Sequence, residues 1–313
     1  MEFDWTKRTV KEWRDLFAEV PRFNVLQAMP YARAVRSVDQ KITRYALIKR
    51  GAEAVGIVAI QEIKLGLVHV IDLYRGPLWF EADPPVSWLE EFADLFSKTY
   101  PSRWLRRRRW LPEWEGSPET DAILKRHGFK FTTQTYETVW LDLSLAEDDL
   151  RRRLKSNWRN HLNQGERSIS RITQDWTGAT ADLFLRQYGV DLTLKGYRGR
   201  KPNFVREEIT AALLFREVVI FWAFDAKDTA SPVAAILLFL HGRSASYRVG
   251  WTTDVGRKAN AHNVLLWEAT CVLKKRGLMF FDLGGVEPAT GEGLTQFKYG
   301  LGGQEFRTPG VFK

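Results

Sequence analysis

Cysteine is nearly absent from this 313-residue chain, in which Cys271 is the only one. One thiol allows neither a disulfide within the chain nor a metal site built on cysteines, which favours a reducing compartment. The five histidines show no spacing typical of metal ligands. We therefore expect no metal site.

Long uncharged apolar runs are also missing. Residues 1–17 include acidic and aromatic side chains and no apolar h-region, which excludes a signal peptide. No stretch reaches the length of a charge-free transmembrane helix. The glycine patterns of Walker and Rossmann nucleotide sites are missing as well. We predict a soluble, cytoplasmic protein, with peripheral contact at the inner face of an anionic membrane as a further option.

Positive charge is abundant, with a net charge of +9 and a pI of about 9.6. The basic residues form three clusters, at 103–109, 151–159 and 195–201. Aromatic residues interleave with them, namely Trp104, Trp110, Trp158 and Tyr197. This mixture suits phosphate binding combined with stacking, although a charge run is most often a solvated face. The pattern does not distinguish RNA from lipid headgroups.

Two similar series of elements follow one another along the chain. Each has helices, then an antiparallel meander, a helix and a strand. We predict helices at 9–20, 86–98, 119–127, 147–164, 180–189, 203–216 and 261–276, and strands at 45–49, 54–63, 67–73, 137–143, 218–225, 233–241, 244–251 and 278–283. This order predicts an α/β (α+β) fold of two duplicated modules, residues 1–145 and 146–313, with mixed, largely antiparallel sheets flanked by helices.

The predicted helix at 147–164 opens the second module. Ser144 with Glu147 three residues later forms a capping-box pattern. Leucine or tryptophan recurs every four residues on one face, which favours a single helix to about Gln164. No low-complexity linker precedes it, so we expect the modules to pack tightly.

The stretch 278–303 is the first candidate site. An apolar run is followed by Asp282, Leu283, Gly284 and Gly285, and a second element spans 294–299. Glycine is needed where the backbone takes positive φ or lies against another surface. Such a strand end places backbone amides and a carboxylate at the rim of a sheet. Composition alone leaves a C-terminal hairpin and a site equally open.

The loop 252–262, between a strand and a helix, is the second candidate. A loop that leads into a helix N-terminus suits an anion. It resembles the place where the GNAT acyltransferase superfamily holds the CoA pyrophosphate. Arg257 fits the first position of that pattern, but Asn260 and His262 replace its two glycines. Their side chains obstruct close backbone approach, which argues against ordinary CoA use.

The chain resembles, over nearly its whole length, the Fem family of aminoacyl-tRNA-dependent peptidyltransferases, which are tandem GNAT-like folds. Residues 281–286 (FDLGGV) are similar to the family's YDLGGV or YDLGGI, and 297–298 (FK) to its Phe-Lys pair. Further matches are 27–33 (QAMPYAR), 75–77 (RGP) and the basic helix that opens the second module.

The resemblance implies donor-binding and catalytic residues. Lys298 is expected to face the transfer centre and the 3′ end of an aminoacyl-tRNA, with Phe297 beside it. Arg257 is a third donor-binding candidate, through its loop. Transfer from an ester to an amine develops negative charge on the carbonyl oxygen, which a fixed cation stabilises. The amine must also lose a proton.

The resemblance also implies acceptor-binding residues. Arg33 stands where a member of the family has a lysine that binds the acceptor's nucleotide phosphates. Either Arg198 or Arg200 corresponds to a second phosphate-binding arginine. Tyr31 and Arg75 lie in the matching segments and complete this set.

Two departures from the family bear on the acceptor. The family has an acidic residue on an Arg-Phe-Asp-Pro strand, whereas residues 105–112 contain no acid and Glu113 is the first to follow. The coiled-coil arm of the larger members is missing. The acceptor therefore need not be a peptidoglycan precursor.

Three functions remain open. The leading hypothesis is transfer of an amino acid from aminoacyl-tRNA to an amine of a phosphorylated cell-envelope precursor or related metabolite, without a protein-bound cofactor. The alternative is an acyl-CoA-dependent GNAT enzyme of polysaccharide or lipid synthesis. The third is an RNA- or membrane-binding protein on a decayed transferase fold.

Overall fold

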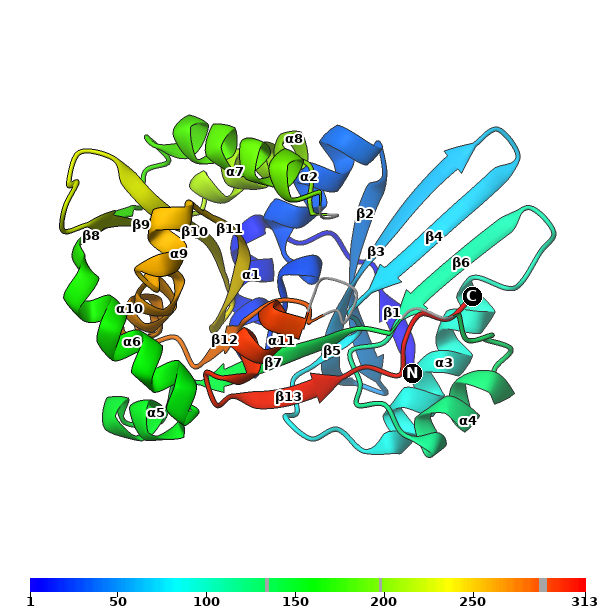
Figure 1. Cartoon of the computed structure of the whole chain (residues 1–313). Coiled ribbons are helices and arrows are strands. Elements are labelled where there is room, and N and C mark those ends of the chain that lie inside the picture. Colours follow the sequence, from blue (N-terminus) through cyan, green and yellow to red (C-terminus); the bar gives the residue numbers. More distant parts are fainter. Residues whose placement is uncertain (133–134, 197–198, 287–291) are drawn as a thin grey trace. The chain divides into compact units, whose positions relative to one another are not determined.

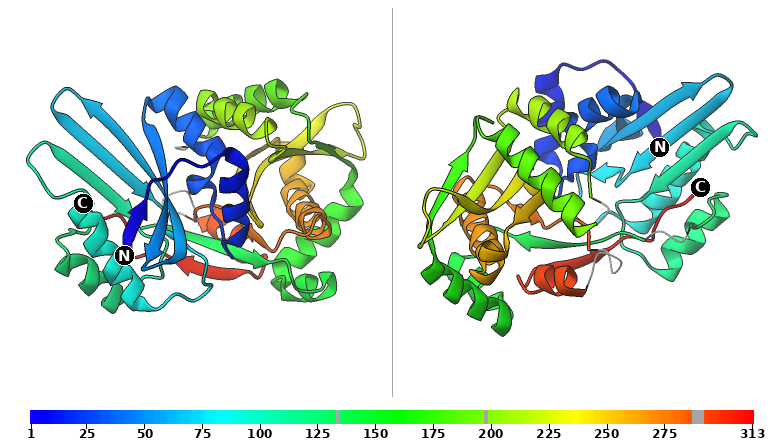
Figure 2. Two further views of the ribbon diagram at one scale, coloured as in Figure 1. Left: turned by 180° about the vertical axis from the view of Figure 1, so that it is seen from behind. Right: turned by 45° about the horizontal axis from the view of Figure 1, so that its top comes forward.

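The computed structural model describes residues 1–132, 135–196, 199–286 and 292–313 (Figure 1). Contacts divide the chain into two units. The first contains Met1–Glu137 and Phe306–Lys313, and the second contains Thr138–Glu305. Both chain termini therefore belong to the first unit (Figure 2).

The first unit is built on a six-stranded sheet. Its strands are β1 (Glu2–Asp4), β2 (Ile42–Arg50), β3 (Glu53–Leu65), β4 (Val68–Tyr74), β5 (Leu78–Trp79) and β6 (Arg106–Leu111), in the order β1-β2-β3-β4-β6 with β5 on β3. Its helices are α1 (Val10–Glu19), η1 (Val25–Gln27), α2 (Met29–Asp39), α3 (Val86–Thr99) and α4 (Pro118–Arg126).

Alternation along the strands builds two cores in this unit. Ile48 of β2 belongs to the cluster of Phe92 from α3, whereas its neighbour Leu47 belongs to the cluster of Phe17 from α1. Successive side chains of a strand point to opposite faces, so the two faces of the sheet are covered by different helices.

The second unit contains a seven-stranded sheet in the order β13-β7-β12-β11-β10-β9-β8. The strands are β7 (Glu137–Asp142), β8 (Ile169–Asp175), β9 (Val218–Asp225), β10 (Pro232–His241), β11 (Ser244–Thr252), β12 (Phe280–Asp282) and β13 (Gln304–Arg307). The helices are α5 (Glu147–Arg153), α6 (Ser156–Ser168), α7 (Ala181–Lys195), α8 (Pro202–Leu213), α9 (Asp254–Lys258), α10 (Ala261–Lys275) and α11 (Glu292–Tyr299).

The two sheets repeat one topology. In the first unit, β2, β3 and β4 form an antiparallel meander, and β4 pairs in parallel with β6 across the connection that contains α3. In the second, β9, β10 and β11 form the meander, and β11 pairs in parallel with β12 across α10. The predicted fold class, with duplicated modules and mixed sheets, is confirmed.

Each unit is completed by a segment from the other half of the sequence. β7, which the sequence analysis counted with residues 1–145, pairs antiparallel with β12 of the second sheet. Phe312 forms a bridge with Trp110 of β6 and so belongs to the first unit. Backbone pairing places these segments, and hydrophobic periodicity in the sequence carries no information about it.

The single helix predicted at 147–164 is wrong. α5 ends at Arg153, because Leu154 and Lys155 take extended backbone angles and the Lys155 amide donates to the Gly300 carbonyl at 2.9 Å. The capping box is also wrong: Ala146 is the N-cap, and the Ser144 hydroxyl donates to Asp142.

The C-terminal hairpin considered for 278–303 is not formed, since the second element is the helix α11. β6 and β8 were missed because their many charged or polar residues hide the apolar alternation of a strand. In the described ranges, no helix is long and apolar enough to cross a membrane.

Candidate functional site: the end of strand β12

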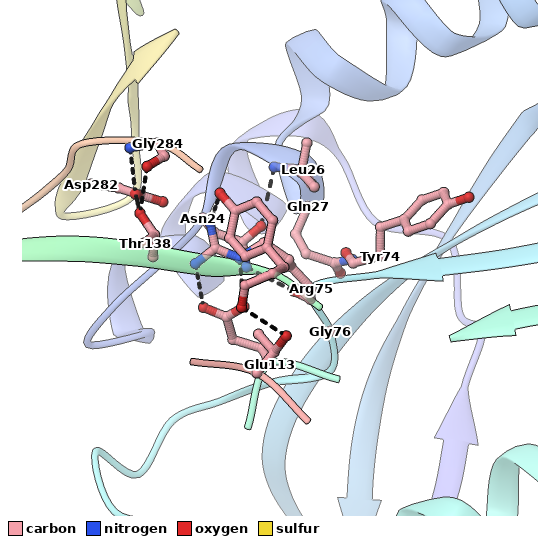
Figure 3. Close-up of polar contacts among 12 residues, drawn as sticks. Asn24, Leu26, Gln27, Tyr74, Arg75, Gly76, Glu113, Thr138, Asp282 and Gly284 are labelled. Carbon is pink, nitrogen blue, oxygen red and sulfur yellow. Dashed lines mark hydrogen bonds and ion pairs between the residues drawn. The ribbon is translucent and has the colours of Figure 1, made fainter. Parts of the chain in front are cut away.

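The Asp282 carboxylate fixes the end of β12. Asp282 is buried, and its Oδ1 accepts hydrogen bonds from the Gly284 amide, at 2.8 Å, and from the Thr138 hydroxyl of β7 (Figure 3). The Thr138 hydroxyl also lies 3.0 Å from the Gly284 carbonyl oxygen. Thr138 and Asp282 are both buried and bonded to each other. Asp282 therefore ties the end of β12 to the glycine turn that follows it.

Lys298, on the last turn of α11, lies above this glycine turn. Its side chain is buried, with only 5% of the residue exposed. The Nζ atom donates to the carbonyl oxygens of Gly285, at 2.7 Å, and Gly284, at 3.2 Å. Nζ also lies 5.6 Å from the centre of the Tyr247 ring, a cation–π distance. The glycine turn thus holds an ammonium group at a fixed, largely dehydrated position.

Glycine is required at position 284 for two reasons. Its φ is +72°, which strains other residues. A Cβ atom there would also lie 2.8 Å from the carbonyl oxygen of Tyr247. The motif therefore keeps the Lys298 ammonium close to β11.

Phe297 is half-buried and packs against two other rings of the second unit. Its ring centre lies 5.9 Å from that of Trp158 on α6 and 6.4 Å from that of His262 on α10. Gly300, directly after α11, leaves room for Trp158, because a Cβ atom at this position would lie 2.5 Å from Trp158 Cδ1. Phe297 thus positions its neighbour Lys298.

β11 contributes a bulge and a buried ion pair that were not predicted from the sequence. Tyr247 pairs with Leu238 and Val249 with Leu237, which leaves Arg248 as the bulged residue. Arg248 donates to both carboxylate oxygens of Glu208 in α8, at 3.0 and 2.7 Å.

The surroundings of this pair are also buried. Glu208 is fully buried, and burial raises the pKa of Tyr247. Burial also raises the pKa of Tyr188 on α7 to about 12. The Tyr188 hydroxyl donates to the Arg200 carbonyl at 2.8 Å. The sequence contains one signal for the buried glutamate. Glu208 stands four residues after Phe204, on the apolar face of the same helix.

The loop at 252–262 is not an open anion cradle. It contains the short helix α9, and four of its amides donate within the loop. The Gly256 amide donates to the Thr253 hydroxyl at 3.0 Å, and the Arg257 amide to the Thr253 carbonyl at 2.9 Å. The amides of Ala259 and Asn260 donate to carbonyls of the same loop. Asn260 keeps the left-handed conformation expected of a glycine, with φ 53°.

Arg257 lies on the exposed side of this loop. Its side chain is 60% exposed and 3.7 Å from Asp254. His262 points inward, where its Nε2 atom would lie 3.1 Å from a Cβ atom at Gly250. The Nε2 atom is buried.

We expect His262 to make the protein less stable in acid. Burial lowers its pKa to about 4. In the unfolded chain the His262 ring protonates near pH 6.5. The neutral ring of the folded protein therefore contributes its full stabilisation above about pH 7, and this contribution is lost as the pH falls from about 6.5 to 4. We expect urea unfolding to show about 2–3 kcal/mol more loss in wild type than in His262→Gln between about pH 7.5 and 4. Equal losses in the two proteins would contradict this assignment.

The predicted acceptor residues separate into exposed and buried groups. Arg33 is exposed and lines a cavity of about 450 Å³ between α2 and β2, together with Arg36 and Tyr45. Tyr31 is buried. Arg200 is exposed, with its guanidinium 5.1 Å from the centre of the Phe204 ring. Arg198 lies outside the described residues.

Arg75 has no surface for a ligand phosphate and is withdrawn from the acceptor set. It is 1% exposed, and its Nε and Nη2 atoms each donate to Glu113 at 2.7 Å (Figure 3). The guanidinium also lies 4.8 Å from the Tyr136 ring centre. The Arg75 carbonyl accepts from the Asn24 side chain at 2.7 Å. The guanidinium of Arg75 is thus used inside the first unit.

Two arginines of the 103–109 cluster are likewise occupied within the fold. Arg109 donates to both carboxylate oxygens of Asp72, at 2.7 and 2.9 Å, and Lys41 donates to the same carboxylate at 2.6 Å. Arg108 is buried, donates to the Tyr100 carbonyl at 3.0 Å and lies over the Phe129 ring. Parallel pairing of β4 and β6 places Arg109 opposite Asp72.

The chain belongs to the acetyltransferase (GNAT) domain family, whose model matches residues 148–306, half of its length. The protein is therefore a transferase of the GNAT class. Its structure is similar to the crystal structure of FemX, with a TM-score of 0.76 and 15% identity over 98% of this chain and 96% of that chain. The tandem GNAT-like fold implied by the Fem resemblance is confirmed.

Two further solved structures share the fold. L-PGS from Bacillus licheniformis gives a TM-score of 0.56 and 13% identity over 97% of this chain and 91% of that chain. A tandem GNAT protein from the clavulanic acid biosynthesis pathway gives 0.52 and 13% over 97% and 94%. No curated protein sequence matches this one.

Proposed function

We propose that this transferase moves an aminoacyl group from aminoacyl-tRNA to an amine of a cell-envelope precursor. The observation that carries the proposal is the buried Lys298 ammonium, held by the carbonyls of Gly284 and Gly285 at the end of β12. The similarity to FemX over nearly the whole of both chains supports it. L-PGS provides a second structure of the same fold.

The chemistry follows from this cation. The acceptor amine attacks the ester carbonyl carbon, the bond from that carbon to the ribose oxygen of the tRNA breaks, and the amine proton ends on the leaving oxygen. Negative charge develops on the carbonyl oxygen in between. A cation fixed in a site with little water stabilises that charge strongly, because it needs no reorganisation during the reaction. Lys298 is the residue to which we assign this role.

Acyl-CoA is the alternative donor, and family membership supports it. The loop at 252–262 argues against it, because a pyrophosphate binds through free backbone amides. Here the amides of Gly256, Arg257 and Asn260 already donate within the loop. In this conformation these three amides are not available to a pyrophosphate.

Incubation with labelled aminoacyl-tRNAs and an envelope-precursor extract tests the function directly. RNase-sensitive transfer of the label to an amine supports the proposal. Transfer from acetyl-CoA, with no transfer from aminoacyl-tRNA, would refute it and favour the alternative.

Arg33→Met is expected to weaken acceptor binding. An exposed guanidinium on the cavity between α2 and β2 is placed to bond an acceptor phosphate. A hydrogen bond to a charged group contributes about 1.5–3 kcal/mol, so we expect KM for the acceptor to rise about 10–100-fold with kcat little changed. Arg126→Met is the matched control, since Arg126 is an exposed cation of the same unit on α4. Equal KM values for the two variants would remove Arg33 from the acceptor site.

A further inference from the structure

Two neighbouring loops project from one end of the first unit's sheet (Figures 1 and 2). One is the end of the β3–β4 hairpin, residues 64–67, which joins the last two residues of β3 to the turn, and the other is the segment 101–105 before β6. The His69 amide donates to the Leu105 carbonyl at 2.8 Å, and His69 pairs with Arg106. This parallel register places Trp104 beside the β3–β4 turn. We call the two loops together the sheet tip.

The sheet tip exposes large apolar side chains. Trp104 is 94% exposed, Leu67 is 84% exposed and Leu65 is 59% exposed. Trp104 is the most exposed of the large hydrophobic residues that the structure describes. Single exposed apolar residues are common in proteins, but three on adjacent loops form a patch that calls for a partner.

Cations surround this patch, and no carboxylate in the two loops opposes them. Lys64, Arg103 and Arg107 are exposed. The acids of the flanking segments 62–72 and 101–112 are Glu62 and Asp72. Asp72 is fully buried between Arg109 and Lys41.

Glu62 is also occupied, since its carboxylate contacts the Tyr100 hydroxyl at 2.6 Å and the His69 ring at 2.9 Å. Arg44 also lies 3.4 Å from Glu62, so both acids have cationic partners within the fold. The exposed charge of the sheet tip is positive.

We propose that the sheet tip docks on an anionic lipid bilayer. Tryptophan prefers the boundary between headgroups and acyl chains, where its ring is buried and its N–H stays hydrated. Leu65 and Leu67 enter the acyl region beside it, and the cations meet lipid phosphates. Binding of this kind adds apolar burial to electrostatic attraction. The proposal does not rest on the proposed aminoacyl transfer.

RNA fits the same surface less well. Nucleic acid would use the cations and stack a base on Trp104. It offers no apolar environment to the two leucines at the end of the β3–β4 hairpin. Leu67 is 84% exposed, more than any other leucine that the structure describes as an exposed large hydrophobic residue. The aliphatic residues therefore favour the bilayer.

Vesicle sedimentation tests the proposal on the full chain. Wild type should bind vesicles of phosphatidylcholine with phosphatidylglycerol and bind pure phosphatidylcholine at least about tenfold more weakly, and about 0.5 M salt should release it. Trp104→Ala with Leu67→Ser should reduce binding by about tenfold or more. The control is Leu214→Ser, which removes a 66%-exposed leucine outside the sheet tip and should bind like wild type.

A second measurement locates the contact. The native Cys271 is buried, so a thiol dye on Leu67→Cys should report this position alone. Its emission should shift to the blue when phosphatidylglycerol vesicles are added. Wild type that fails to bind these vesicles, a double variant that binds equally well, or an unshifted dye would overturn the proposal. Trp104-dependent binding of tRNA without vesicle binding would overturn it in favour of RNA.

Discussion

We expect Lys298→Met to reduce the rate of aminoacyl transfer by about 10²–10³-fold, which is the loss typical when one fixed donor to a developing oxyanion is removed. The ammonium of Lys298 is 5% exposed and held by the Gly284 and Gly285 carbonyls. Methionine keeps the length and apolar contacts of the side chain but not its charge. Single-turnover transfer from a purified aminoacyl-tRNA measures the effect on the chemical step.

Stability must be separated from catalysis in this experiment. Lys298→Met leaves two backbone carbonyls without their donor, at a cost of about 1–3 kcal/mol. Lys274→Met is the matched control, because the Lys274 ammonium donates to the Leu143 carbonyl at 3.0 Å in the same unit. We expect both variants to lose stability and only Lys298→Met to lose the rate. A full rate in folded Lys298→Met would show that this lysine is a structural anchor.

The strand end at 281–286 could be predicted from the sequence because its information is local. An apolar run, an acid and two glycines follow one another within residues 278–285. The Asp282 carboxylate accepts from the Gly284 amide two residues later. The contact of Asp282 with Thr138 of β7, 144 residues away, could not be predicted from this local pattern.

The buried ion pairs could not be predicted, because their partners are distant in sequence. Glu208 and Arg248 are 40 residues apart, and Arg109 and Asp72 are 37 apart. Charge clusters in the sequence therefore mix internal and exposed cations. Burial also separates the chain's tryptophans, since Trp110 is fully buried while Trp104 is 94% exposed.

Arg75→Met is expected to destabilise the first unit by about 3–5 kcal/mol, because breaking a buried ion pair leaves an uncompensated charge. Glu113, with a side chain only 11% exposed, would lose a partner that donates two hydrogen bonds at 2.7 Å. Urea unfolding, followed with a probe in the first unit, measures the change. If Arg75 bound a ligand phosphate, its substitution would instead raise KM and leave the free energy of unfolding nearly unchanged.

Arg50→Met is the control that separates the effect of burial from the effect of losing an ion pair. Arg50 of β2 also contacts both carboxylate oxygens of one glutamate, Glu91 of α3, at 3.2 and 3.0 Å. Its side chain is 53% exposed, so water replaces the lost partner and we expect a cost of at most about 1 kcal/mol. Removing Glu113 as well, in Arg75→Met/Glu113→Leu, should recover part of the loss, because no unpaired charge then stays buried. If Arg75→Met costs no more than Arg50→Met, the Arg75–Glu113 pair does not hold the first unit together, and Arg75 returns to the acceptor-binding candidates.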